Sequence, residues 1–255
     1  MTMMMTMTSA FAERIAKSSK LHRSRLVLAL DPSPKVEDLV GFAKKALELS
    51  DHICAIKINF HLLLPLQLSE VKSITDLAHS RDIQTIADVK LNDISTTNEA
   101  ALSHLWSAGF DALTVNPIIG FDALRQVIEN AHGNSNGVIA LVYMSHRSAA
   151  QTYGMQVTDA ENRKRQMHEV FLDWAEELGA DGIVVGATVP DIIRQCSSRI
   201  KRTIAIFSPG VGAQGGDVKQ ALANGSDYLI VGRSIIEAGD PKGEASRMQA
   251  LSWTG

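Results

Sequence analysis

Short apolar runs rich in β-branched residues recur along the whole chain, and each has the length of a strand rather than of a membrane-spanning helix. Helical patterns fill the gaps between these runs, including residues 36–49, 121–131, 170–178 and 218–223. A regular alternation of strand and helix is typical of a parallel sheet covered by helices. The eight candidate strands are residues 26–30, 55–59, 85–89, 112–115, 138–143, 182–185, 204–207 and 228–231.

Eight strand–helix units in 255 residues match a closed (β/α)8 TIM barrel better than an open doubly wound sheet. An open sheet of the dinucleotide-binding type has a glycine-rich turn after its first strand, whereas this first strand ends in Asp31-Pro32. We therefore predict a single α/β domain, with the barrel over residues 21–255 and residues 1–20 as a partly frayed or helical N-terminal extension. Ser33 is expected to cap the helix over 36–49, with Pro34 in its first turn.

Composition excludes several classes of partner. The net charge is -3 and basic residues form no long run, so neither a nucleic acid polymer nor a membrane surface is expected to bind. Cys54 and Cys196 lie far apart, which provides no metal-binding spacing and no disulfide framework. The Met-rich start lacks the basic and apolar regions of a signal peptide. These features predict a cytoplasmic protein without a bound metal.

The segment Asp88-Val-Lys90-Leu-Asn-Asp93 places an acid, a base and a second acid around the end of one apolar run. Side chains two apart on a strand share a face, so Asp88 and Lys90 should project together. A solvated surface pair is the ordinary explanation for two such charges, but the apolar strand argues against it. Asp93 lies beyond the strand and can serve another site, even one in a partner subunit.

Other polar residues also follow the predicted strands, and in a closed parallel barrel the chemistry lies at the carboxyl ends of the strands. Each residue alone has a structural explanation, such as a turn cap at Asp31 or an ordinary loop hydroxyl at Ser145. Together they indicate one functional site at the mouth of the barrel. The residues are Asp31, Lys57, Asn59, Asp88, Lys90, Ser145, Ser208, Pro209, Gly232 and Arg233.

A glycine-rich segment over 208–216 follows the seventh strand, and Gly232-Arg233 follows the eighth. Barrels often bind phosphate between these two loops. Glycine lets backbone N–H groups approach an anion, a guanidinium grips two phosphate oxygens at once, and Gln214 can close the grip. A flexible turn would explain the glycines alone, but the pairing with Arg233 favours a phosphate site.

In combination, these motifs resemble the orotidine 5′-monophosphate decarboxylase family over nearly the whole chain. The motifs, in the family's order, are Leu28–Asp31, Lys57, Asp88–Ile94, Ser208–Gly216 and Val231–Ser234. The resemblance implies decarboxylation of orotidine 5′-monophosphate to uridine 5′-monophosphate in pyrimidine synthesis, without a cofactor. It also implies a homodimer.

The resemblance further implies a role for each site residue. Lys57, Asp88, Lys90 and Asp93 would form an alternating charge network, in which Lys90 stabilises and then protonates the carbanion. Asp93, Ile94 and Thr97 would reach the neighbouring active site across the dimer interface. The other substrate contacts would come from Asp31, Lys57 and Thr97 to the ribose, Ser145 to the pyrimidine, and Pro209, Gln214, Gly232 and Arg233 at the phosphate.

Two other readings remain open. Sugar-phosphate decarboxylases and hexulose-phosphate synthases of the same superfamily also carry Asp-x-Lys-x-x-Asp, but they use a magnesium ion. They need an acidic ligand soon after the first strands, where this chain has Lys57. A barrel that binds a phosphorylated metabolite without turning it over is the third possibility, and the intact set of charges argues against it.

Overall fold

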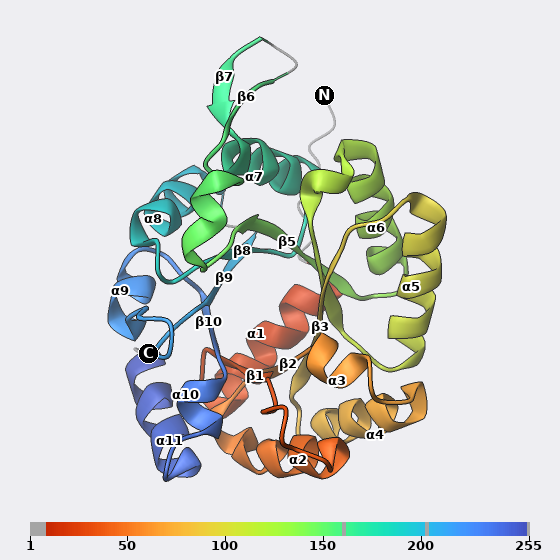
Figure 1. The fold of residues 1–255 in the computed structure, drawn as a ribbon, viewed down its shortest axis with the longest axis vertical. Coiled ribbons are helices and arrows are strands. Elements are labelled where there is room, and N and C mark those ends of the chain that lie inside the picture. Colours follow the sequence, from red (N-terminus) through yellow and green to blue (C-terminus); the bar gives the residue numbers. More distant parts are fainter. Residues whose placement is uncertain (1–8, 160–161, 202–203, 254–255) are drawn as a thin grey trace.

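The computed structural model describes residues 9–159, 162–201 and 204–253. Within these residues, eight parallel strands close into a barrel in the order β1-β10-β9-β8-β5-β4-β3-β2 (Figure 1). The predicted (β/α)8 barrel is therefore confirmed. Most strands are buried along their entire length, which explains why they read as continuous apolar runs. Their bounds are β1 Leu26–Leu30, β2 Ala55–Asn59, β3 Gln84–Leu91, β4 Ala112–Val115, β5 Gly137–Tyr143, β8 Gly182–Val185, β9 Ala205–Pro209 and β10 Tyr228–Val231.

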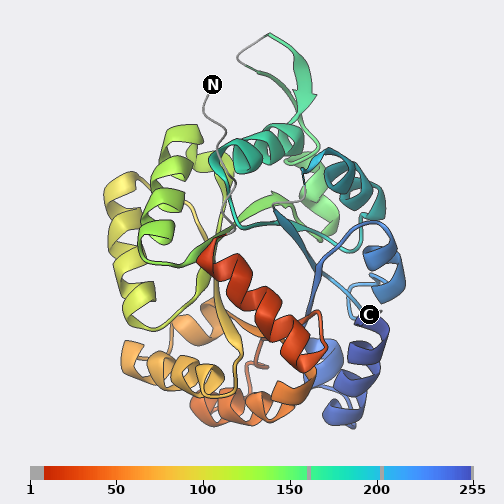
Figure 2. The same cartoon turned by 180° about the vertical axis from the view of Figure 1, so that it is seen from behind.

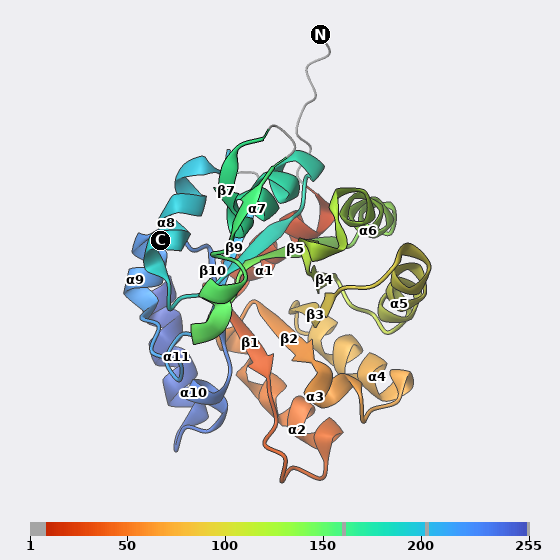
Figure 3. The same ribbon diagram turned by 45° about the horizontal axis from the view of Figure 1, so that its top comes forward.

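Helices surround the barrel as an outer ring (Figures 1 and 3). The bounds are α2 Leu39–Ala46, α3 Phe60–Leu63, α4 Leu68–His79, α5 Ser95–Ser107, α6 Phe121–Gly133, α7 Met167–Leu178, α8 Pro190–Arg199, α9 Val218–Ala223, α10 Arg233–Ile236 and α11 Pro241–Ser252. Short 3-10 helices cover Leu47–His52, Pro117–Ile119 and Arg147–Gln151. Among the helices of the described residues, none is long and apolar enough to cross a bilayer.

The start of the second helix differs from the sequence prediction. Helix α2 begins at Leu39, and the carboxylate of Asp38 caps it by accepting a hydrogen bond of 2.7 Å from the backbone N–H of Gly41. The carbonyl of Ser33 instead accepts from the N–H of Val36, which closes a turn around Pro34. The predicted Ser33 cap was wrong because the helix begins only at Leu39, after this turn, and Asp38 is the residue directly before it.

A two-stranded hairpin between the 3-10 helix Arg147–Gln151 and α7 was not predicted. Strands β6 (Gln156–Thr158) and β7 (Lys164–Gln166) pair in antiparallel fashion and project beyond the helix ring (Figure 1). Their side chains are exposed or half-buried, so the segment lacks the apolar alternation that identifies a strand in sequence. An ion pair of 2.6 Å between Arg165 and Asp173 connects the hairpin to α7.

Helix α1 (Ala10–His22) lies across the end of the barrel at which the strands begin (Figure 2). The side chains of Phe11 and Ile15, which belong to this helix, are buried. The ring of Phe11 occupies the space that a side chain at Gly137 would need. Arg14 donates hydrogen bonds to Gln84 at the start of β3 and to Asp111 just before β4. The helix thus closes the lower end of the barrel.

At this end of the barrel, where the strands begin, two buried carboxylates each lie beside a histidine. Asp111 accepts hydrogen bonds from the backbone N–H and hydroxyl of Thr85 at 2.8 and 2.9 Å, and it lies 2.8 Å from His79 Nε2. Asp181 lies 3.1 Å from His132 Nε2. The hydrogen bond to the carboxylate raises the pKa of each histidine above its ordinary value, despite partial burial.

Candidate active site

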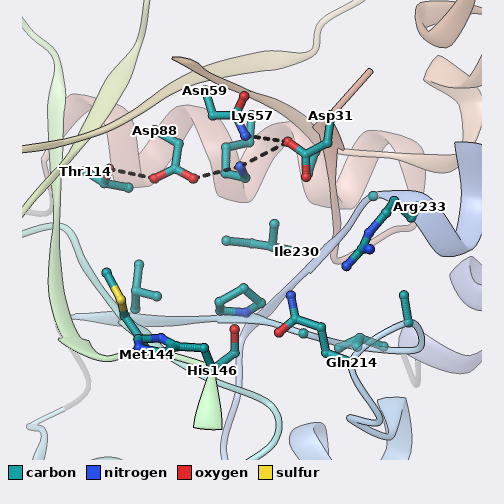
Figure 4. Close-up of a pocket in the computed structure, with 18 of the residues that line it drawn as sticks. Asp31, Lys57, Asn59, Asp88, Thr114, Met144, His146, Gln214, Ile230 and Arg233 are labelled. Carbon is teal, nitrogen blue, oxygen red and sulfur yellow. Dashed lines mark hydrogen bonds and ion pairs between the residues drawn. The ribbon is translucent and has the colours of Figure 1, made fainter. Parts of the chain in front are cut away.

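A cavity of about 250 Å³ opens at the carboxyl ends of the barrel strands. Apolar residues contribute to its lining, and Figure 4 shows charged and polar side chains on two facing sides, with Ile230 between them. Ten of the residues predicted for the site line this cavity, namely Asp31, Lys57, Asn59, Asp88, Lys90, Ser145, Pro209, Gln214, Gly232 and Arg233.

One side of the cavity carries a chain of alternating charges built on β2 and β3. Lys57 Nζ lies 2.7 Å from Asp88 Oδ2, and Lys90 Nζ lies 2.7 Å from Asp88 Oδ1. The two ammonium groups differ in burial, because the Lys57 side chain is 7% exposed and the Lys90 side chain is 40% exposed. Lys57 is therefore fixed within the protein, whereas Lys90 presents its charge to the cavity.

Asp88 is held in its ionised form by its neighbours. Burial alone would raise the pKa of its carboxyl, but the charges of Lys57 and Lys90 and the hydrogen bonds from both outweigh burial. The net effect holds the pKa of Asp88 well below its usual range. At neutral pH the site consequently contains a carboxylate between two ammonium groups.

Lys90 reaches this position by an irregular backbone. Its φ is 45°, in the left-handed region, and the pairing of β3 with β4 shifts register between Ala87 and Leu91. The predicted contact between Asp88 and Lys90 is present, but the regular strand assumed for it is not. The backbone N–H of Lys90 donates to Thr114 Oγ1 at 2.9 Å, and the same hydroxyl donates to Asp88 Oδ1 at 2.9 Å.

Thr114 was missed by sequence reasoning, because it is one polar residue within the apolar run of β4. An isolated threonine in a strand is common, and only the location of its partners reveals a connection with the site. Asn59 was noted at the end of β2, and the structure places its Nδ2 at 2.6 Å from Asp31 Oδ1. Asp31 also lies 3.9 Å from Lys57 Nζ, so it joins the same network (Figure 4).

The facing side of the cavity comes from the loops after β9 and β10. Gln214 and Arg233 lie there, away from the charged row (Figure 4). The loop turns through Gly210, with φ 94°, where a Cβ would lie 2.9 Å from the Cβ of Ser145. The hydroxyl of Ser234 accepts a hydrogen bond of 2.8 Å from the backbone of Ala213, which connects the two loops.

Four predicted site residues lie outside the lining of this cavity. Ser208 is fully buried in β9, where its hydroxyl oxygen accepts a hydrogen bond of 2.8 Å from the hydroxyl of Ser226. Asp93, Ile94 and Thr97 are at the start of α5, and all three are exposed. Ile94 is 70% exposed, which is unusual for an isoleucine. The structure of one chain therefore does not bring these residues to their own chain's charged network.

A cavity at the carboxyl ends of the strands that is lined by several charged side chains defines a (β/α)8 barrel of the enzyme type. Within the part of the chain that the structure describes, no three His, Cys, Asp or Glu side chains come together as ligands for a metal ion. The residues that meet there are instead cations alternating with carboxylates.

Comparison with known proteins defines the family. The sequence model of the "Orotidine 5'-phosphate decarboxylase / HUMPS family" matches residues 24–248. The orotidine 5'-phosphate decarboxylase of Thermococcus kodakarensis is 35% identical over 232 residues, which cover 89% of this chain and 96% of the relative. That of Methanosarcina barkeri is 33% identical over 228 residues, covering 89% and 94%.

Solved structures agree with the sequence relatives. The crystal structure of orotidine 5'-phosphate decarboxylase from Pyrococcus horikoshii matches with a TM-score of 0.72 and 32% identity, covering 89% of this chain and 98% of that chain. The enzyme from Methanocaldococcus jannaschii, solved in complex with the inhibitor BMP, matches with a TM-score of 0.77 and 28% identity, covering 91% and 99%. The chain belongs to the orotidine 5'-phosphate decarboxylase / HUMPS family.

Proposed function

We propose that this protein decarboxylates orotidine 5′-monophosphate to uridine 5′-monophosphate in pyrimidine synthesis, without a cofactor. The observation that carries the proposal is the arrangement of Lys57, Asp88 and Lys90, in which two ion pairs of 2.7 Å hold a partly exposed ammonium at the cavity. A carbanion-forming reaction needs such a fixed positive charge where negative charge develops.

The reaction assigns a step to Lys90. The bond between C6 of the pyrimidine and its carboxylate breaks, carbon dioxide leaves, and the electron pair remains on C6. This carbon has no adjacent carbonyl group to accept the pair, so the protein must stabilise the anion. The ammonium of Lys90 does so and then donates a proton to C6, while Asp88 keeps Lys90 charged and oriented.

The far side of the cavity suits the phosphate. Arg233 can hold two phosphate oxygens, and Gln214 and Gly232 lie on the same side. We propose that the loop over 209–216 closes on the bound nucleotide and removes water from the reacting ring. Binding energy from the phosphate then contributes to positioning the distant pyrimidine.

We further propose a homodimer in which each site is completed by the neighbouring chain. Exposed apolar side chains lie in the segments that directly follow β2, β3 and β4, and they include Phe60 at 50%, Leu64 at 78%, Ile94 at 70% and Ile118 at 54%. An interface there would bury them. It would also let the partner subunit's Asp93, the partner subunit's Ile94 and the partner subunit's Thr97 reach the cavity. Analytical ultracentrifugation would measure the mass, and a monomer at assay concentration would contradict this assembly.

We place the enzyme in the cytoplasm. Cys54 and Cys196 are free and buried, and burial raises the pKa of both thiols. Inert free thiols suit a reducing compartment.

The deciding experiment follows the ultraviolet absorbance of orotidine 5′-monophosphate after addition of purified protein with excess chelator. Rapid, metal-independent loss of the substrate spectrum is the expected result. Activity that disappears with the chelator would favour a magnesium-dependent sugar-phosphate enzyme of the same family. Binding of uridine 5′-monophosphate without turnover would favour a non-catalytic barrel.

A further inference from the structure

The hydroxyl of Thr114 forms hydrogen bonds with both charged residues at the end of β3, Asp88 and Lys90. It accepts a hydrogen bond of 2.9 Å from the backbone N–H of Lys90. It also donates to Asp88 Oδ1 at 2.9 Å (Figure 4). An ionised carboxylate only accepts and a backbone N–H only donates, so the single hydroxyl proton must point at Asp88. The residue is 3% exposed, and water has little access to replace it.

Thr114 also touches the part of β3 that departs from regular geometry. Lys90 has a φ of 45°, a conformation that costs a side-chain-bearing residue about 1 kcal/mol or more. Such a conformation persists only where surrounding contacts determine it. Here one contact holds the backbone of Lys90, through Thr114, and another holds its ammonium, through Asp88.

The carboxylate of Asp88 is shared unequally. Among the described residues, Oδ2 accepts a hydrogen bond from Lys57 only, whereas Oδ1 accepts from both Lys90 and Thr114. The Thr114 bond therefore acts together with the two ion pairs to restrict the rotation of the carboxylate about its last torsion. Without it, Oδ1 keeps the bond from the partly exposed Lys90 and loses its buried neutral donor.

We propose that Thr114 is a positioning residue for the reaction: its one hydroxyl sets both the carboxylate of Asp88 and the left-handed backbone of Lys90, and so aims the Lys90 ammonium into the cavity. The proposal rests on the decarboxylase function proposed above. It adds a neutral residue on β4 to a set of charges that come from β2 and β3.

The test compares Thr114→Val, which removes the hydroxyl at nearly constant volume, with Thr114→Ser, which keeps it. Thr85→Val is the matched control, because Thr85 is also a fully buried threonine whose hydroxyl donates to a carboxylate, Asp111, at 2.9 Å. That carboxylate lies at the other end of the barrel, next to α1. The control therefore loses the same kind of bond away from the cavity.

We expect Thr114→Val to lower kcat about 10- to 100-fold, the effect of losing a hydrogen bond to a charged group, with KM changed by about threefold or less. Thr114→Ser should recover most of the lost kcat. Thr85→Val should unfold at a lower temperature and keep its kcat. A merely structural role for Thr114 would instead make the two valine variants behave alike.

Three results would overturn the proposal: a folded Thr114→Val enzyme with wild-type kcat, a fall in kcat that Thr114→Ser shares fully, or a change confined to KM. If Thr114→Val does not fold, Thr114→Ala removes the same hydroxyl and takes its place. Wild-type protein that fails to turn over orotidine 5′-monophosphate would refute the proposed function instead. A crystal structure of the valine variant then decides the matter, because Lys90 unmoved in φ and ammonium position would refute the positioning role.

Discussion

Replacement of Lys90 by alanine separates the chemistry of the site from its stability. The Lys90 side chain is 40% exposed, and Asp88 keeps its contacts with Lys57 at 2.7 Å and Thr114 at 2.9 Å when the ammonium is removed. A partly exposed ion pair contributes about 1 kcal/mol or less to the free energy of unfolding. The variant should therefore fold normally.

The effect on turnover should be far larger. Two opposite charges about 4 Å apart gain about 4 kcal/mol at an effective dielectric constant of about 20. If Lys90 stabilises the carbanion at such a distance, its loss lowers kcat by about a thousandfold, because about 1.4 kcal/mol corresponds to a factor of ten. Loss of the proton donor adds to this figure.

The assay measures three quantities on Lys90→Ala: kcat from ultraviolet absorbance, affinity for uridine 5′-monophosphate by calorimetry, and the midpoint of thermal unfolding. Lys72→Ala is the control, since it also removes a lysine from a 2.7 Å ion pair, with Asp76 on the surface of α4. Turnover within about tenfold of wild type would refute the carbanion role. Loss of nucleotide binding together with turnover would show that Lys90 acts mainly in assembling the site.

Three further predictions concern other parts of the molecule. Arg233→Ala should raise KM about tenfold or more with a smaller change in kcat, because a bidentate phosphate contact is lost; steady-state kinetics that leave KM unchanged would contradict the phosphate role. Lys57→Ala should lower the free energy of unfolding by about 3 kcal/mol in a denaturant titration, because it leaves the buried Asp88 with one ammonium partner. The raised pKa of His79 means that its bond to Asp111 stabilises the fold fully below about pH 6.5 and that this contribution is lost as pH rises through the raised value. Between pH 6 and 9, the midpoint of thermal unfolding should accordingly fall less in His79→Gln than in wild type. Equal slopes of this midpoint against pH in the two proteins would exclude the His79–Asp111 pair as a source of the pH dependence.

Strand positions could be predicted because their signal is local. β1, β2, β4, β8 and β10 have the predicted bounds, since each is a buried apolar run ended by polar residues. The hairpin of β6 and β7 could not be predicted in the same way, because it packs few side chains and depends on ion pairs such as Arg165 with Asp173. A hydrophobic pattern in the sequence reveals strands and helices that bury apolar side chains, but it does not reveal elements whose side chains stay exposed.

The charged part of the site was predictable for a related reason, because charges at the ends of buried strands are rare without a function. Asp88 and Lys90 do meet, but through a left-handed Lys90 that no sequence pattern indicates. Thr114 lies 24 residues from Lys90 along the chain, and only the closed sheet brings the two together. The role predicted for Asp93 in a neighbouring site stays a prediction.

The two sides of the cavity belong to different halves of the chain. Asp31, Lys57 and Asp88 precede residue 115, whereas Gln214 and Arg233 follow residue 185. A nucleotide that contacts both sides recognises only the closed barrel, so its binding free energy adds to the free energy of unfolding. Bound substrate then holds the two halves of the barrel together. In a cell rich in nucleotide, the enzyme with its site filled is therefore more stable to unfolding than the empty enzyme.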